Sequence, residues 1–201
     1  MADVRFLLWD FGDTLVDERW LWSCPDGFPE WAAHYRAVCG GELGSRWNCG
    51  TASLDDLADD LVARLGMTKD AVLAHARRCC GEIQFFEHAW AAACSRALPQ
   101  ALVTVNPDVF RDVVMANYPI TGTFDAVVIS AEAATENKAD LCELAAVELG
   151  CEDPSHALLI DNIGANVDAW RARGGSAYWF RNDATFATDL AAGSWNGLAA
   201  S

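Results

Sequence analysis

The chain has few basic side chains and lacks the patterns of several common protein classes. Its 201 residues include 14 Lys and Arg against 29 Asp and Glu, which gives a formal net charge of −15. Binding to a nucleic acid duplex depends on basic side chains that neutralise phosphates, so we expect no nucleic acid partner. No apolar run approaches the roughly 20 residues that cross a bilayer, and we expect no membrane-spanning segment.

The sequence also shows neither metal-binding cysteine pairs nor the pattern of a signal peptide. Its eight cysteines form no Cys-x-x-Cys pair with the spacing of zinc ligands. The first residues, Met-Ala-Asp-Val-Arg, are not followed by the long apolar region of a signal peptide, so we expect a cytoplasmic protein with reduced thiols. The chain contains 52% hydrophobic and 21% charged residues, which is the composition of an ordered globular protein.

Short apolar runs alternate with helical patterns in the second half of the chain. A run at residues 5–9 ends abruptly at Asp10 and predicts a buried first strand. Beyond Pro99, helical patterns separate further apolar runs, and this alternation predicts βαβ units. We therefore expect an α/β fold with a doubly wound, Rossmann-like parallel sheet that has helices on both faces. The later strands are predicted at 101–105, 126–129, 157–160 and 177–180, and the main helices at 138–149 and 165–173.

A helical segment interrupts this pattern directly after the first strand. Ser53 and Asp56 resemble a capping box, leucines continue one helical face, and Gly66 ends that helix. Further helical patterns cover 68–81 and 85–98.

We therefore expect an α/β core formed by residues 1–15 and 99–201, with an inserted helical cap domain at 16–98. Ligands of such sheets bind beyond the carboxyl ends of the strands, which is where the insertion leaves the core and returns to it. The cap is expected to cover a site at this edge.

Polar side chains stand at the ends of the predicted strands, in an order that suits one reaction. An aspartate nucleophile, a hydroxyl, a lysine and a carboxylate that holds a divalent cation would support formation of an aspartyl-phosphate. Each residue alone is equally well explained as a turn or a helix cap, but the whole set favours a site at one rim of the sheet. Its members are Asp10, Asp13, Thr104, Asn106, Lys138, Asp161 and Asn162.

These residues lie in four segments that resemble the motifs of the haloacid dehalogenase (HAD) superfamily. Asp10-Phe11-Gly12-Asp13-Thr14-Leu15 resembles the first motif, Thr104 at a strand end the second, and Lys138 in Glu-Asn-Lys-Ala-Asp the third. Residues 159–167, Leu-Ile-Asp-Asn-Ile-Gly-Ala-Asn-Val, are similar to the fourth motif in the form found in the phosphatase domain of soluble epoxide hydrolases. The resemblance covers nearly all of the predicted core, and the insertion matches a helical cap of the first (C1) type in its placement.

The resemblance implies a Mg²⁺-dependent hydrolase, most simply a phosphatase that acts on a small phosphorylated metabolite. Asp10 would be the nucleophile and a metal ligand, and Lys138 would balance the charge of nucleophile and phosphoryl group. Thr104 and Asn106 would bind the substrate together with Lys138. The implied metal ligands are Asp10, the Gly12 carbonyl, Asp161 and Asn162.

The sequence departs from this pattern at two positions. Phosphatases of the superfamily usually carry a second aspartate two residues after the nucleophile, as general acid and base, and this chain has Gly12 there. Because general acid–base catalysis contributes roughly 10²–10⁴-fold, another group would have to substitute. Asn162 stands where relatives commonly have a carboxylate, which should weaken Mg²⁺ binding. Replacement acids in the sequence are Asp13, Asp17, Glu18 and the cap residue His34.

Other functions therefore stay open. A 2-haloacid dehalogenase-type hydrolase would use no metal and bind a carboxylate substrate, which Asp161 would repel unless a cation offset it. A phosphonate-cleaving relative would need a cap lysine, and Lys69 is the only one. A catalytically degenerate member would keep the core for folding and bind a ligand or a partner, and Gly12 and Asn162 favour this alternative.

Overall fold

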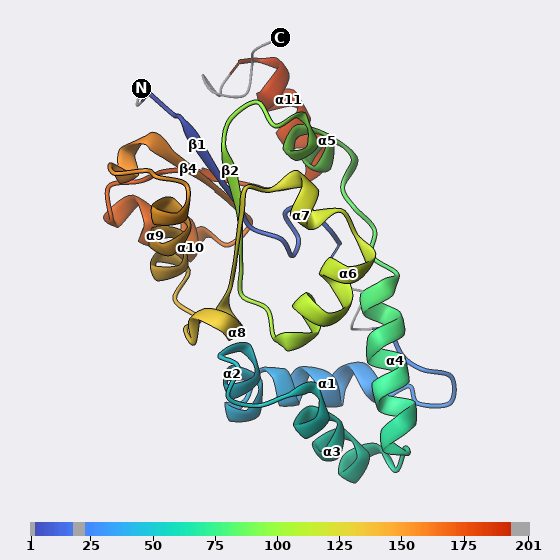
Figure 1. Cartoon of the computed structure of the whole chain (residues 1–201). Coiled ribbons are helices and arrows are strands. Elements are labelled where there is room, and N and C mark those ends of the chain that lie inside the picture. Colours follow the sequence, from blue (N-terminus) through green and yellow to red (C-terminus); the bar gives the residue numbers. More distant parts are fainter. Residues whose placement is uncertain (1–2, 18–22, 194–201) are drawn as a thin grey trace.

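The computed structural model describes residues 3–17 and 23–193. Its centre is one sheet of five strands, all parallel, in the order β3-β2-β1-β4-β5 (Figure 1). The predicted α/β fold with a Rossmann-like parallel sheet is confirmed. The strands are β1 Phe6–Trp9, β2 Gln100–Thr104, β3 Ala126–Ile129, β4 Ala157–Asp161 and β5 Ser176–Trp179.

Both faces of the sheet are covered, because successive residues of a strand point to opposite sides. Leu8 of β1 belongs to a buried cluster with Val103 and Leu159, and this cluster is completed by α9 and α10. Leu7 and Trp9 belong to the cluster on the other side, which is completed by α5, η2, α6, α7 and α11. The helices of the core are α5 Glu87–Ser95, η2 Phe110–Val114, α6 Met115–Asn117, α7 Ile120–Thr123, α8 Ser130–Ala133, α9 Lys138–Glu148, η3 Pro154–His156, α10 Gly164–Ala172 and α11 Asp183–Ala191.

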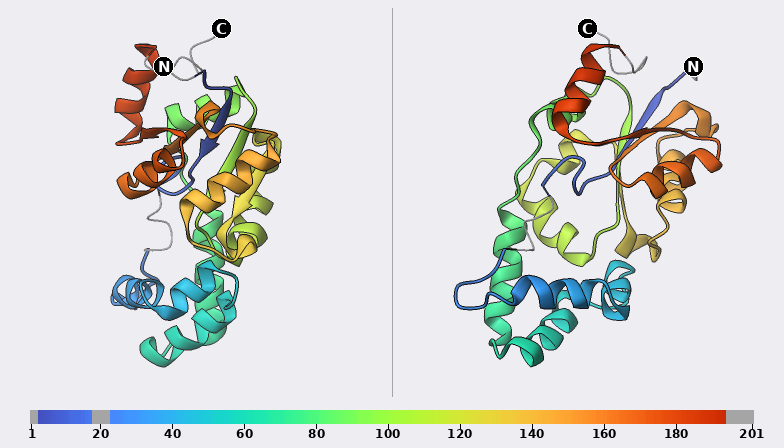
Figure 2. Two further views of the ribbon diagram at one scale, coloured as in Figure 1. Left: turned by 90° about the vertical axis from the view of Figure 1, so that its left-hand side faces the viewer. Right: turned by 180° about the vertical axis from the view of Figure 1, so that it is seen from behind.

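The inserted helices gather at one end of the molecule, away from α11 and from the start of β1 (Figures 1 and 2). They are α1 Trp31–Cys39, α2 Glu42–Asn48, α3 Leu54–Leu65 and α4 Lys69–Gly81. The capping box predicted for α3 is present: the Ser53 side chain accepts from the Asp56 backbone, and the Asp56 carboxylate accepts from the Ser53 backbone. Gly66 then ends this helix with a φ of 66°.

The inserted helices and the core share a hydrophobic interior. Trp31 and Trp47 are buried in the same cluster as Trp9 of β1, so these two aromatic residues serve packing. Within the predicted 16–98 insertion, α5 packs beside α11 on the core, and its first turn donates two backbone hydrogen bonds to the Asp183 carboxylate. The domain boundaries themselves stay a prediction.

Two helices of the core have irregular ends or turns. The helix after β2 begins at Asp108 and Val109, continues as the π-helical turn η2 and ends in the short α6. The helix expected over 85–98 spans only Glu87–Ser95, because Arg96 adopts a left-handed conformation with a φ of 49°. None of the helices within 3–17 and 23–193 is long and apolar enough to cross a membrane.

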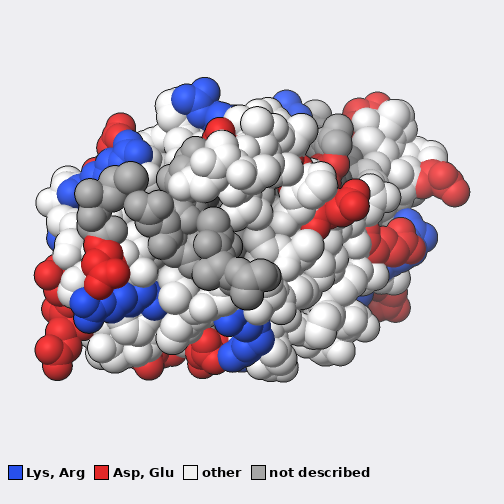
Figure 3. All heavy atoms as spheres, turned by 90° about the horizontal axis from the view of Figure 1, so that it is seen from above, with Lys and Arg blue, Asp and Glu red and all other residues white. Residues whose placement is uncertain are grey.

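Basic side chains on the surface lie mostly beside acidic ones, as the face in Figure 3 shows. Arg173, for example, donates to both Asp140 and Glu143, at 2.9 and 2.5 Å. Arg111 forms a bidentate ion pair with Glu132, in which both hydrogen bonds measure 2.6 Å. The few cations of this acidic chain are thus largely engaged in local ion pairs.

Candidate active site

Asp10 lies directly after β1, at the carboxyl edge of the sheet. Its N–H donates to the Ile160 carbonyl at 2.9 Å, which fixes the backbone beside β4. Asp10 is 7% exposed, and both of its carboxylate oxygens are engaged. Oδ1 accepts from Lys138 Nζ at 2.5 Å, and Oδ2 accepts from Thr14 Oγ1 at 3.1 Å. The carboxylate is therefore held in one orientation.

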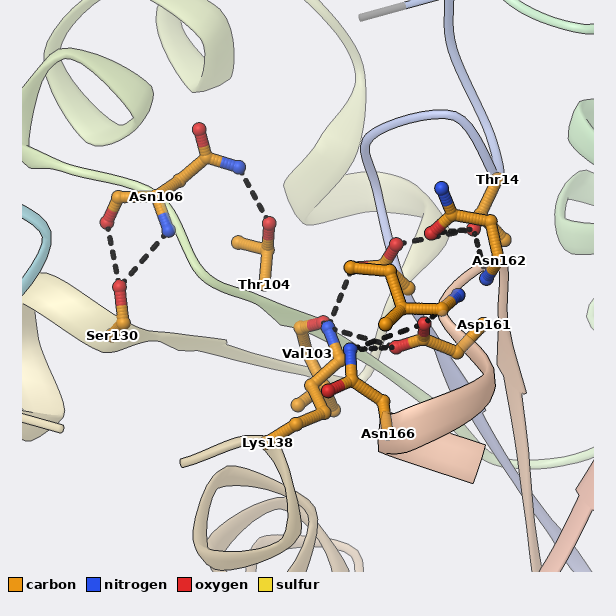
Figure 4. A network of polar contacts seen from close by, with 11 residues as sticks. Thr14, Val103, Thr104, Asn106, Ser130, Lys138, Asp161, Asn162 and Asn166 are labelled. Atoms are coloured by element: carbon orange, nitrogen blue, oxygen red, sulfur yellow. Dashed lines mark hydrogen bonds and ion pairs between the residues drawn. The ribbon is translucent and has the colours of Figure 1, made fainter. Parts of the chain in front are cut away.

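Lys138 reaches Asp10 from the first turn of α9. Asn137 caps this helix by accepting from two backbone N–H groups, and Lys138 follows at once. The buried Nζ donates to Asp10 and to the Val103 carbonyl of β2, the latter at 2.7 Å, and lies 3.4 Å from Asp161 Oδ2 (Figure 4). One ammonium group thus joins the ends of β1, β2 and β4.

Asp161 ends β4 and is fully buried. Its Oδ1 accepts from the Ile163 backbone at 2.7 Å and from Asn166 Nδ2 at 3.2 Å. Its Oδ2 accepts from the same Asn166 nitrogen at 3.1 Å and faces Lys138. Asn166, on α10, therefore clamps both oxygens of Asp161, and the carboxylate is saturated with donors.

Thr14 and Asn162 close the network between the first and the last motif. Thr14 Oγ1 lies 3.5 Å from Asn162 Oδ1 and accepts from the Asn162 backbone at 3.2 Å. The carbonyl of Asn162 accepts from Trp179 Nε1 at 2.9 Å, which fixes the loop from the side of β5. Asp10 Oδ2 and Asn162 Oδ1 therefore both lie beside one hydroxyl.

Thr104 and Asn106 form a second group, next to the first. Asn106 Nδ2 donates to Thr104 Oγ1 at 2.6 Å, and the Asn106 N–H donates to Ser130 Oγ at 3.0 Å. Figure 4 shows this group beside the Asp10 network, with Val103 as the neighbour that both share along β2. Among the residues described, no hydrogen bond joins Thr104 or Asn106 to Asp10; the two groups meet only at the strand end.

The electrostatics of the first group are dominated by burial and by an excess of negative charge. Two carboxylates, Asp10 and Asp161, face one ammonium, which leaves a net charge of −1. Burial raises the pKa of Asp10 to about 6, and Asp161 adds to this while Lys138 opposes it. Burial would lower the pKa of Lys138, but the two carboxylates outweigh burial and raise it. Counted formally, one of the two carboxylates has no cation of its own.

A divalent cation fits this group by charge and by donor type. The uncompensated charge is buried, and Asp10 Oδ2 and Asn162 Oδ1 are hard oxygens of the kind that Mg²⁺ binds. Within the described residues no three His, Cys, Asp or Glu side chains form a metal-binding group. Because the Asp161 carboxylate already accepts from several donors, Asp10 would be the main anionic ligand of the cation. A site with so few anionic ligands should bind Mg²⁺ weakly.

The two other residues predicted from the first motif differ in exposure. Gly12 is buried and bridges Val16, whereas Asp13 is exposed and has a φ of 50°. The structure thus joins Asp10 to Lys138 and Thr14, whereas the Asp13 side chain is exposed. Asp17 and His34 are partly exposed, and Glu18 lies outside the described residues.

Sequence reasoning did not assign four participants of the site. Thr14 and Asn166 belong to motifs that were recognised, but their side-chain partners are distant in sequence. Ser130 begins α8 and is fully buried, and a buried serine at a strand end is the signal that could have found it. The Val103 carbonyl that accepts from Lys138 has no signal in the sequence, because every residue carries such a group.

The larger of two described cavities lies elsewhere, between the turn after α2 and the start of α8. It measures about 500 Å³ and is lined by Gly50, Thr51, Ala52, Ser53, Asp56, Asp108, Arg111, Asp112, Ala131 and Glu132. Asp10 lines neither this cavity nor a smaller one beside α3 and α4. We assign the site from its converging side chains, since none of them lines either cavity.

Comparison with known proteins places this geometry in a fold family. No protein-family model and no curated protein sequence matches the chain. A HAD family enzyme from Bacteroides thetaiotaomicron, solved in complex with magnesium and inorganic phosphate, superposes with a TM-score of 0.68 at 15% identity, over 88% of this chain and 93% of that one. The L-2-haloacid dehalogenase from Xanthobacter autotrophicus gives 0.66 at 19% identity, over 94% and 83%.

A predicted HAD-like family hydrolase from Porphyromonas gingivalis superposes with a TM-score of 0.63 at 15% identity, over 89% of this chain and 91% of that one. The chain therefore has the haloacid dehalogenase-like fold, and the resemblance inferred from its four motifs is confirmed at this level. The likeness covers most of each chain.

Proposed function

We propose that the chain is a HAD-type hydrolase in which Asp10 attacks the phosphorus of a small phosphate ester. The observation that carries the proposal is the buried Asp10 carboxylate, held between Lys138 and Thr14 at the carboxyl ends of parallel strands. Burial raises the pKa of Asp10, and a buried carboxylate with a shifted pKa is a candidate nucleophile.

In the first step a new bond forms between an Asp10 oxygen and phosphorus while the bond to the ester oxygen breaks. The electron pair leaves with the alcohol oxygen, which takes a proton from an acid or from water. Lys138 balances the charge of the carboxylate and of the phosphoryl group, and the hydroxyl and amide of Thr104 and Asn106 are the nearby donors for phosphoryl oxygens. A Mg²⁺ held by Asp10, Asn162 and the Gly12 carbonyl, with Asp161 behind them, would neutralise phosphoryl charge.

In the second step water attacks the phosphorus and the bond to Asp10 breaks, which returns the carboxylate. This step needs a base, and the position that normally provides one is Gly12. We therefore propose a slow enzyme in which the aspartyl-phosphate persists, with Asp13, the nearest other carboxylate in sequence, as the candidate replacement for that base.

A second candidate is a 2-haloacid dehalogenase-type hydrolase, in which Asp10 would displace a halide from carbon. The hydrogen-bond saturation of Asp161 favours it, because a carboxylate engaged by Asn166, Ile163 and Lys138 is poorly available to a metal. Similarity in fold to a dehalogenase is compatible with this reading. A ligand-binding role without turnover is the third candidate and predicts no covalent chemistry at Asp10.

The test is hydrolysis of a generic aryl phosphate with and without Mg²⁺, alongside halide release from short 2-haloacids. Asp10→Asn removes the nucleophile, and Asp168→Asn is the matched control, because Asp168 is an exposed carboxylate on α10. Metal-dependent turnover that Asp10→Asn abolishes and Asp168→Asn retains supports the phosphatase. Halide release with the same dependence on Asp10 supports the dehalogenase, and no turnover on either panel supports the binding role.

A further inference from the structure

The helix α2 contacts the core beside each segment that carries a substrate-binding side chain. Its polar contacts go to Ser130, Glu136 and Asp108. These three core residues are adjacent, in hydrogen bonding or in sequence, to Asn106 and Lys138 of the candidate site. Through the polar contacts of α2, the inserted helices are thus tied to the loops that shape the site.

Ser130 is the buried link. Its Oγ donates to the backbone carbonyl of Asn48, the last residue of α2, at 2.7 Å, and the Asn106 carbonyl is a longer alternative acceptor at 3.1 Å. The same Oγ accepts from the Asn106 N–H at 3.0 Å, and Asn106 in turn donates to Thr104 Oγ1. A continuous chain of hydrogen bonds therefore runs from α2 to the Thr104 hydroxyl.

Glu136 is the second link, two residues before Lys138. Its carboxylate accepts from Ser45 Oγ at 2.6 Å and from Asn48 Nδ2 at 2.8 Å. Asn137 between them caps α9, so the segment from Glu136 to Lys138 has little freedom once Glu136 is held. Charge-assisted hydrogen bonds to a carboxylate are among the stronger ones available on a surface.

Asp108 is the third link, two residues after Asn106. One of its oxygens accepts from Trp47 Nε1 at 2.6 Å, and the other accepts from the Leu54 backbone at 3.2 Å. Next to it, the turn after α2 lies against α8 so closely that a Cβ on Gly50 would meet the Ala131 carbonyl oxygen at 2.2 Å. The turn after α2 and the start of α8 are thus closely packed, backbone against backbone.

We propose that docking of α2 on the core positions the substrate-binding side chains, with Ser130 and Glu136 as positioning residues that act through Asn106 and Lys138. The proposal rests on the proposed function for the identity of the ligand, phosphate. The coupling itself can be measured without turnover. When α2 is docked, Asn106 and Lys138 are held in their observed places; when it is released, both segments lose an anchor.

The test perturbs α2 and observes the core. In the double variant Ser45→Ala/Asn48→Ala every core residue stays intact, and both changed residues are partly or fully exposed. We expect the rate of amide exchange over residues 104–108 and 136–139 to rise by about five-fold or more, which is the lower limit of typical coupling between two sites. The dissociation constant of inorganic phosphate should rise by a similar factor. Glu136→Ala breaks the same contact from the other side, and combining the three changes should add nothing.

Asp60→Ala is the matched control, because it removes an exposed polar contact, with Arg64, inside α3. It should leave exchange at 104–108 unchanged. Faster exchange confined to α2 itself, with 104–108 and 136–139 as in the wild type, overturns the proposal. Absence of phosphate binding by the wild-type protein would count against the proposed function alone, since the exchange measurement still decides whether α2 and the site are coupled.

Discussion

Lys138 and Asp10 lie 128 positions apart in the sequence and form a buried ion pair at 2.5 Å. The pair unites the first strand with the first turn of α9, and the buried carboxylate of Asp161 lies on its other side. Charges removed from water are costly unless each has a partner. Here one cation serves two carboxylates, so the site depends on Lys138 more than on any other side chain.

Lys138→Met should therefore destabilise the protein strongly. The methionine fills a similar volume but leaves Asp10 and Asp161 buried without a cation, for which we expect a loss of about 3–5 kcal/mol. Urea denaturation at pH 7 measures the change. Lys69→Met is the control, because the exposed Lys69 pairs with Asp55 and Asp59 on the surface and should change stability little. Equal midpoints for the two variants would contradict this account.

Gly12→Asp should increase turnover of a phosphate ester. It supplies a carboxyl group at the position of the missing acid and base, which is worth roughly 10²-fold or more when the group is well placed. Gly12 is not among the described glycines with positive φ, so an aspartate meets no backbone penalty there. Steady-state kinetics with an aryl phosphate measure the effect. Gly12→Asn has the same shape without the acid, and a gain shared by both variants would show that protonation is not the cause.

Asn162→Asp should strengthen binding of Mg²⁺. Asn162 Oδ1 already lies beside the hydroxyl that contacts Asp10, so the change adds a second anionic ligand at the same place. Affinity for hard cations rises with the number of charged ligands, and we expect about a tenfold lower dissociation constant by calorimetry. Asn117→Asp, on the exposed end of α6, is the control and should bind Mg²⁺ as the wild type does. An unchanged affinity in Asn162→Asp would place the cation elsewhere.

Most of the sheet was predictable from the sequence because β1 to β4 are almost entirely buried and largely apolar. The run at 126–129 coincides with β3, and the run at 157–160 misses only the final Asp161 of β4. The helices α1 and α2 were predicted only as part of a helical segment. Their termini lack side-chain caps, so no local signal marks where each one starts.

The candidate site was predictable to the extent that strand ends converge. Asp10, Lys138 and Asp161 meet as expected, since the carboxyl ends of parallel strands share one edge. The separation of Thr104 and Asn106 into a second group was not predictable, because it depends on Ser130 and on the end of α2. Such contacts are set by tertiary packing and leave no pattern in the local sequence.

His75 should make stability fall as the pH drops below about 6.5, the usual pKa of an unfolded histidine. It is buried on α4, and burial, the largest cause, lowers its pKa. The hydrogen bond to the Ser23 carbonyl and the charge of Glu82 oppose this, and Arg78 adds to it. Nε2 lies 2.6 Å from that carbonyl and must donate, and Nδ1 lies 2.9 Å from an Arg78 nitrogen and must accept. The folded state therefore holds the neutral ring.

Because the pKa of His75 is lower in the folded state, its stabilising contribution is complete above pH 6.5 and is lost as the pH falls, when only the unfolded chain takes up the proton. One such residue changes the free energy of unfolding by up to about 1.4 kcal/mol per pH unit. Urea denaturation measures this dependence on pH. The wild type and His75→Gln are compared between about pH 7.5 and 5.0, on both sides of the pKa of an unfolded histidine. His88→Gln changes an exposed histidine and should keep the dependence on pH. Parallel curves for wild type and His75→Gln would mean that the buried ring does take up the proton, against the hydrogen bonds that define its tautomer.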